Sequence, residues 1–170
     1  MPIEPSGGCL NWRMLVLTRQ LTLGQFDVKI CMIGSKAFFD TNVLLYLYSG
    51  EDVQKRKRAR DLFEHHGRAK RILLSTQVVQ EFYAAGSRKL RLPRRELKDA
   101  VIKFLDLPLV RIGAAQILAA IEIEERYQTS FWDALILAAA ESGGAEVVYT
   151  EDLNDGQRYG SVLVQNPFGH

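Results

Sequence analysis

The sequence predicts an α/β fold in which helices flank a central, mostly parallel sheet of four to five strands. Two observations carry this prediction. From Ser35 onward, short apolar runs alternate with helix-length amphipathic segments, as expected when helices connect parallel strands. The chain of 170 residues is also long enough to bury a core as one domain, and its composition, 47% apolar and 25% charged, is ordinary for a globular protein.

Five short apolar runs account for the expected strands. They cover residues 37–39, 71–74, 109–112, 146–149 and 162–164. Asp40 closes the first run, and Gly143-Gly144 separates the fourth run from the helix before it. The sequence contains no internal repeat and no low-complexity tract, so we expect a single structural unit.

Helical periodicity fills the intervals between these runs. The first helix carries Val43 and Leu47 on one face, and the second begins near Asp52. Either Ser75 or Thr76 is expected to cap the third helix. Further helices are expected at residues 94–105, 114–127 and 131–141. The last of these is rich in alanine and almost entirely apolar, which predicts burial on most sides.

The charge pattern leaves the binding partner open. The formal net charge is only +2, which by itself does not indicate a nucleic-acid binder. Two basic runs stand out, Lys55 to Arg60 and Arg88 to Lys98. Each is explained either by a solvated helix face or by a positive rim that attracts a phosphate backbone. Because no apolar stretch reaches roughly 18 residues, the composition predicts no membrane span.

Residues 1–34 differ from the rest of the sequence. They show no clear hydrophobic period and lack the pattern of a secretory signal. We expect an N-terminal extension, either partly disordered or packed as an additional strand, with Met32 as an alternative start. The domain itself is expected to cover residues 35–166. Cys9 and Cys31 lie in the extension and form no C-x-x-C pair, so we expect no structural zinc site and reduced thiols in a cytoplasmic protein.

Four acidic residues stand where parallel sheets bind ligands. Asp40 ends the first strand, and Asp152 follows the fourth. Glu81 lies in the helix after the second strand, and Asp133 lies in the first turn of the alanine-rich helix. Ligands of open parallel sheets bind at the carboxyl ends of the strands, so these carboxylates are expected at one edge.

Such a cluster of carboxylates requires neutralisation. Like charges about 4 Å apart cost on the order of 4 kcal/mol per pair at an effective dielectric constant near 20. Oxygen ligands without His or Cys fit Mg²⁺ or Mn²⁺, and the sequence leaves open whether one ion or two would bind. A bound ion of this kind activates water against a phosphodiester, as in nucleases.

Each acid also has a structural explanation. Asp40 would cap the helix that follows it, and Asp133 would complete a capping box with Ser130. Glu81 would be a surface acid, and Asp152 would belong to a polar turn. The joint placement of all four acids favours the functional interpretation.

Three segments of the sequence resemble the PIN domain family, and specifically the VapC-type toxins of bacterial toxin-antitoxin pairs. They are residues 38–44 (FFDTNVL), 130–136 (SFWDALI) and 149–153 (YTEDL). Glu81 matches the acid that this family carries on an intervening helix. The resemblance covers about residues 35–164, and the long segment before Ser35 departs from the family pattern.

The resemblance implies a PIN-like three-layer fold and a magnesium-dependent endoribonuclease, with Mn²⁺ as a substitute ion. It implies that Asp40, Asp133, Glu81 and Asp152 are the catalytic and metal-binding residues. Thr41, Asn42, Ser130 and Thr150 match polar positions that support the acids or the scissile phosphate. The implied partners are an RNA substrate, a small antitoxin protein and a second copy of the chain. Asp155 is an extra acid without an assigned part, and Glu151 is expected to point away from the site.

Two alternatives to a PIN ribonuclease remain at this stage. A PIN-like interaction module would keep the fold without the chemistry, and the presence of all four acids argues against it. A phosphotransferase of the haloacid-dehalogenase type also places Asp at the end of its first strand. That family carries a second acid two positions later, where this chain has Asn42.

Overall fold

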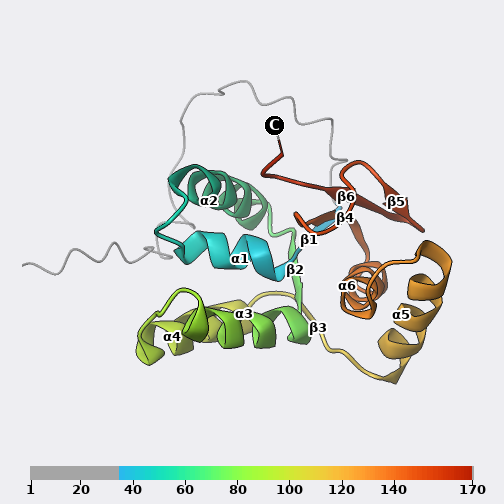
Figure 1. The fold of residues 1–170 in the computed structure, drawn as a ribbon, viewed down its shortest axis with the longest axis horizontal. Helices are drawn as coiled ribbons and strands as arrows, with labels where there is room; N and C mark the ends of the chain where they lie inside the picture. Colours follow the sequence, from blue (N-terminus) through green and yellow to red (C-terminus); the bar gives the residue numbers. More distant parts are fainter. Residues whose placement is uncertain (1–34, 170) are drawn as a thin grey trace, which may run out of the picture.

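The computed structural model describes residues 35–169, and these residues form an α/β domain around one sheet (Figure 1). The strands, in chain order, are β1 (Lys36–Phe39), β2 (Ile72–Ser75), β3 (Leu109–Val110), β4 (Ala145–Tyr149), β5 (Arg158–Tyr159) and β6 (Val162–Gln165). Their spatial order is β3-β2-β1-β4-β6-β5, and every pairing is parallel except that of β5 with β6. The predicted fold class is confirmed. The predictions for residues 1–34 lie outside the described residues.

Two strands differ from the sequence prediction. β3 ends at Val110 because the backbone N–H of Ile112 donates to the hydroxyl of Thr76 (3.1 Å) rather than to a neighbouring strand. β5 was not expected, since two residues are too short to show a pattern. It turns back into β6 through Gly160, whose φ of 59° is a conformation that glycine adopts without strain. The sheet therefore has six strands rather than four or five.

The helices cover both faces of the sheet. They are α1 (Thr41–Tyr48), α2 (Val53–Arg68), α3 (Thr76–Arg88), α4 (Arg94–Leu105), α5 (Ala114–Tyr127) and α6 (Phe131–Ser142). Figure 1 shows α1 to α4 on one side of the sheet, with α6 and α5 on the other. Of the two residues considered as the cap of α3, Ser75 takes this part by accepting from the backbone N–H of Val78. Within residues 35–169, no helix is both long and apolar enough to cross a membrane.

α6 is buried along most of its length, as its composition predicts. Residues 134–140 are at most 4% exposed. The helix ends at Gly143, where any added Cβ would collide with side chains of Leu73 and Val110 on the sheet. This close approach fixes the position of α6 against the sheet and so also places the first turn of the helix, which carries Asp133.

A buried histidine stands between α2 and the sheet. His66 is 2% exposed and packs against the rings of Phe39 and Tyr149, with Nε2 3.2 Å from the Tyr149 hydroxyl. Its Nδ1 has no hydrogen-bond partner. Burial, reinforced by the charges of His65 and Arg71, lowers the pKa of His66 to about 4.

We predict that His66 makes the fold sensitive to mild acid. Because its folded pKa lies below the unfolded value of 6.5, the unfolded chain takes up a proton first, and stability falls as the pH drops from 6.5 towards 4. The loss is roughly 2 to 3 kcal/mol. Urea unfolding across this range should show a shallower decline for His66→Leu than for the wild type. The exposed neighbour provides the control, His65→Gln, which should keep most of the decline. Equal slopes for His66→Leu and the wild type would contradict the assignment.

Candidate active site

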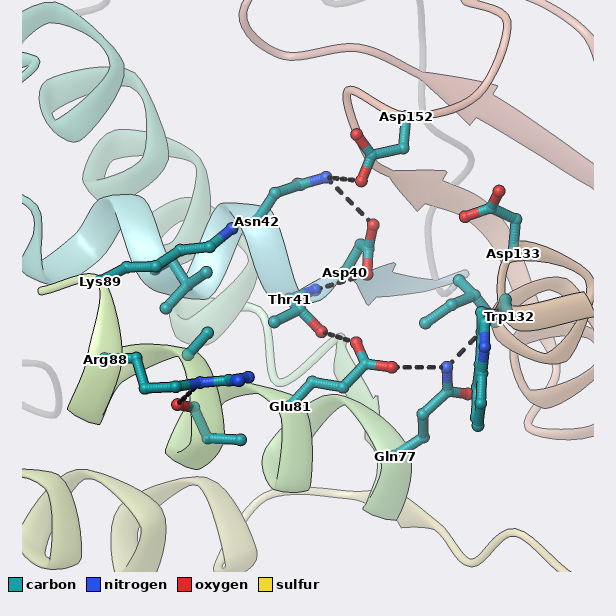
Figure 2. Close-up of a pocket in the computed structure, with 14 residues that line it drawn as sticks. Asp40, Thr41, Asn42, Gln77, Glu81, Arg88, Lys89, Trp132, Asp133 and Asp152 are labelled. Carbon is teal, nitrogen blue, oxygen red and sulfur yellow. Dashed lines mark hydrogen bonds between the residues drawn. The ribbon is translucent and has the colours of Figure 1, made fainter. Parts of the chain in front are cut away.

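A pocket of about 330 Å³ opens at the carboxyl edge of the sheet, between α1, α3 and α6 (Figure 2). Its walls combine acidic, amide, apolar and basic side chains. The lining residues are Asp40, Thr41, Asn42, Leu45, Gln77, Glu81, Ala84, Ala85, Arg88, Lys89, Trp132, Asp133, Ile136 and Asp152. All four acids singled out in the sequence therefore face one cavity, although as many as 112 positions separate them in the chain.

Asp40 is the most buried of the four acids, with 7% of its surface exposed. One carboxylate oxygen accepts from the backbone N–H of Thr41, and the other accepts from the Thr150 hydroxyl (2.7 Å) and the Asn42 amide (3.1 Å). Burial raises the pKa of Asp40 to about 6, against the lowering effect of the Thr150 and Thr41 hydrogen bonds, and the charges of Asp152 and Glu81 add to the rise. An ionised Asp40 is thus costly in these buried surroundings.

Glu81 reaches the pocket from α3. One of its oxygens accepts from the hydroxyl of Thr41 (2.7 Å), and the other accepts from the amide of Gln77 (2.9 Å). Gln77 also donates to the backbone carbonyl of Trp132 (3.3 Å), so both of its neighbours are acceptors and its NH₂ group must face them. Sequence reasoning missed Gln77. The available signal was its spacing, four residues before Glu81 on the same helix face.

Asn42 stands between two of the carboxylates. Its amide nitrogen lies 3.1 Å from an oxygen of Asp40 and 3.0 Å from an oxygen of Asp152 (Figure 2). The same nitrogen lies 3.1 Å from the hydroxyl of Thr150, which in turn accepts from the backbone N–H of Asp152 (3.1 Å). The polar residues predicted from the first and third motif segments therefore contact the acids directly.

Asp133 lies in the first turn of α6 and is held separately. The hydroxyl of Ser130 donates to its carboxylate (2.7 Å) and accepts from its backbone N–H (3.1 Å). This cap is the structural explanation considered for Asp133, and the carboxylate nevertheless lines the pocket. Capping and a place in the site are thus compatible for this residue.

The donor set fits a hard divalent cation in its chemistry. The four carboxylates supply only oxygen, and the hydrogen bonds that hold them in the described part of the chain come from hydroxyls, amides and backbone N–H groups, all of them neutral. As placed, no three acidic, His or Cys side chains among residues 35–169 are arranged to hold one ion. The acids share a pocket, and three of them would have to move closer together to hold one ion.

The two remaining acids near the site have other partners. Glu151 forms an ion pair with Lys55 (2.6 Å) and accepts from the hydroxyl of Tyr46 (2.8 Å), so it points away from the pocket as expected. Asp155 accepts from the backbone N–H of Asn166 (2.8 Å) and does not line the pocket. Its observed contact is therefore with the turn after β6.

Comparisons with known proteins identify the family. The sequence profile of the PIN domain matches residues 37–158, and the chain therefore belongs to the PIN domain family. This confirms the resemblance seen in the three motif segments and favours it over the haloacid-dehalogenase alternative. No curated protein sequence matches the chain at a significant level.

Solved structures share the fold. A toxin-antitoxin complex from Klebsiella pneumoniae has 20% identity and a TM-score of 0.59, with 78% of this chain and 98% of that chain covered. A sarcin-ricin-loop-cleaving VapC toxin from Mycobacterium tuberculosis has 21% identity and a TM-score of 0.56, with 66% and 87% covered. A DNA-bound VapBC complex from Salmonella typhimurium has 18% identity and a TM-score of 0.58, with 78% and 98% covered. At these identities the likeness is one of fold.

We predict that removing the charge of Asp40 stabilises the metal-free fold above pH 6. Because the folded pKa of about 6 exceeds the ordinary value of 3.8, the folded state binds the proton more tightly, and stability falls as the pH rises from 4 to 6. Asp40→Asn escapes this cost, which is roughly 2 to 3 kcal/mol for a shift of this size. Urea unfolding in a chelator should show the gain at pH 7 and its disappearance near pH 4.

The control for this measurement is Glu146→Gln, which neutralises an exposed acid on β4 outside the pocket. It should change stability little at any pH. An Asp40→Asn variant that is no more stable than the wild type at pH 7 would show that burial of this carboxylate carries no net cost.

Proposed function

We propose that this PIN domain protein is a metal-dependent endoribonuclease that hydrolyses RNA phosphodiester bonds and acts as the toxin of a toxin-antitoxin pair. One observation carries the proposal: four carboxylates from separate segments line a single pocket at the carboxyl edge of the sheet. Carboxylates and a phosphodiester are both anionic and repel each other. A pocket lined by four acids and by no His or Cys therefore suits a phosphodiester only when a divalent cation lies between the acids and the phosphate.

In this proposal Asp40 and Asp133 are the principal ligands of Mg²⁺, for which Mn²⁺ would substitute, and Glu81 and Asp152 complete the cluster. The ion would lower the pKa of a water and stabilise the leaving oxygen. Neighbouring side chains of the protein would orient the carboxylates around this ion. Asn42 separates Asp40 from Asp152 by donating to both, which offsets the repulsion between the two carboxylates.

The hydroxyls around the site have a positioning part in the proposal. Thr150 is 1% exposed and holds one oxygen of Asp40, and Thr41 holds one oxygen of Glu81. Ser130 does the same for Asp133. Both oxygens of Asp40 and both oxygens of Glu81 accept hydrogen bonds, and each carboxylate keeps a further lone pair for a ligand. In the proposal these contacts orient the acids in the pocket.

The antitoxin is the proposed regulatory partner. Two of the solved structures that share the fold are described as toxin-antitoxin or VapBC complexes, and this motivates the proposal of a small inhibitory protein that covers the pocket. A toxin that acts on cellular RNA would work in the cytoplasm, and we propose that location for this chain.

The first test is isosteric replacement of the acids. Asp40→Asn and Asp133→Asn should each lower Mg²⁺-dependent cleavage of single-stranded or structured RNA by more than about 100-fold. Loss of a residue that only orients a metal ligand typically costs about 10- to 100-fold, and loss of the ligand itself should cost more. Circular dichroism should show an intact fold. Cleavage is followed on gels with Mg²⁺, with Mn²⁺ and with a chelator, which should stop it.

Glu151→Gln is the matched control, because Glu151 adjoins Asp152 in sequence but pairs with Lys55 outside the pocket. It should retain cleavage. Cleavage that persists in the chelator, or full activity of both Asn variants, would overturn the metal-dependent mechanism. A protein that never cleaves RNA with either metal would instead be the silent interaction module.

We also propose a homodimer, supported by apolar side chains that α5 leaves exposed. Ile117, Leu118 and Ile121 are 42%, 63% and 39% exposed, and they lie on adjacent turns. Surface patches of this kind are commonly covered by association. Light scattering after size exclusion should give the mass of a dimer for the wild type and of a monomer for Leu118→Glu. A monomeric wild type would contradict the proposal. Glu122→Gln, on the same helix, is the control and should remain a dimer.

A further inference from the structure

Two features of the pocket have no part in the proposed chemistry. Arg88 and Lys89 line it together with the acids, and so does the side chain of Trp132. Figure 2 shows the two basic residues on one side of the acids and the indole on the other. The pocket is thus bracketed by a cationic wall and an aromatic wall.

The cationic wall comes from the end of α3. Both side chains are exposed, and within residues 35–169 neither makes an ion pair. Arg88 donates through Nε to the carbonyl of Ala84 in its own helix (3.2 Å), and this bond leaves the other guanidinium N–H groups available. Guanidinium and ammonium groups are the side chains that bind phosphate oxygens most strongly.

The other basic run is different. Lys55 is held by Glu151, and Arg58 donates to the backbone carbonyls of Phe168 and Gly169. No residue of Lys55 to Arg60 lines the pocket. Of the two basic runs in the sequence, only the second therefore supplies cations at the acids.

The aromatic wall is Trp132, directly before Asp133 in α6. Its residue surface is 61% exposed, although indole is among the side chains that gain most from burial. Gln77 binds its backbone carbonyl, and the ring of Phe131 lies 5.5 Å from its own. An exposed ring at the lip of a site is a platform on which a base can stack.

We propose that Trp132, Arg88 and Lys89 position the RNA in the pocket, with one unpaired base stacked on Trp132 and a phosphate bound by Arg88 and Lys89 across the acids. This inference rests on the proposed function and adds the residues that hold the substrate. A base inside a duplex has both faces covered by its neighbours, so away from the helix ends an indole stacks on an unpaired base. Trp132, Arg88 and Lys89 are positioning residues that touch the substrate without taking part in the chemistry.

Fluorescence tests the aromatic contact. The chain has two tryptophans, Trp12 and Trp132, so the full-length Trp12→Phe, Asp40→Asn variant reports on Trp132 alone and should not cleave the probe. A short, mixed-sequence, single-stranded RNA added in Mg²⁺ should quench this fluorescence, and the duplex of the same sequence should not. Trp132→Leu should weaken binding of the probe about 5- to 100-fold, and Trp132→Tyr should restore most of it. Tyr83→Leu, on an exposed ring outside the pocket, is the control.

Salt dependence tests the phosphate contact. Arg88→Gln and Lys89→Gln should each weaken binding of the same probe and lower the slope of log Kd against log salt by about 0.7, the value for one phosphate contact to a single strand. Lys70→Gln removes the same charge just before β2, at the opposite edge of the sheet, and should change neither quantity.

These results separate the binding mode from the activity. If the wild type cleaves RNA but the Trp132, Arg88 and Lys89 variants bind the probe with the same affinity and salt slope as the control variants, the binding mode alone is overturned. Quenching and slope changes as expected, without cleavage by the wild type, would support the binding mode and overturn the nuclease. Absence of quenching by RNA, equal binding of the duplex, or a Trp132 signal that responds only to an added antitoxin would each overturn this inference.

Discussion

The active-site pocket is built around one buried carboxylate, that of Asp40 at the end of β1. It is 7% exposed, and its hydrogen bonds come from neutral groups on α1 and on the loop after β4. Burial of a charge with neutral partners alone is unfavourable for folding, as the raised pKa of this group shows. Such a cost persists where the group serves a site. α1 and the loop after β4 supply the donors to Asp40, whereas Glu81 of α3 adds to the rise in its pKa.

The local pattern of the sequence was enough for the fold and for the acids. Apolar runs placed the main strands within a residue or two, and the composition of α6 correctly indicated its burial. Asp40 and Asp152 follow the carboxyl ends of parallel strands, and Glu81 lies in the helix after one, so these acids could be gathered at one edge. Asp133 joins them because it begins the helix that leads back to the start of β4. These predictions depend on short-range periodicity and on a general rule of topology, so a single sequence contains them.

The contacts inside the pocket depend on long-range geometry that a single sequence does not contain. Asn42 meets Asp152 across 110 positions, and Gln77 meets the carbonyl of Trp132 across 55. The sequence assigned Asn42 a supporting part by resemblance and gave Gln77 none. The sequence also did not distinguish the two basic runs from each other. In the structure, only the run at the end of α3 faces the acids. Side-chain direction, and not spacing, made that difference.

The contact of Glu151 with Lys55 has a consequence for motion. It ties the segment after β4 to α2 at the residue next to Asp152, and Tyr46 of α1 joins the same contact. The main chain at this corner is therefore anchored by a side chain that faces away from the pocket. Asp152 itself is exposed, and its carboxylate accepts from the amide of Asn42 (3.0 Å). An anchored backbone thus carries a carboxylate that solvent and an arriving ligand can both reach.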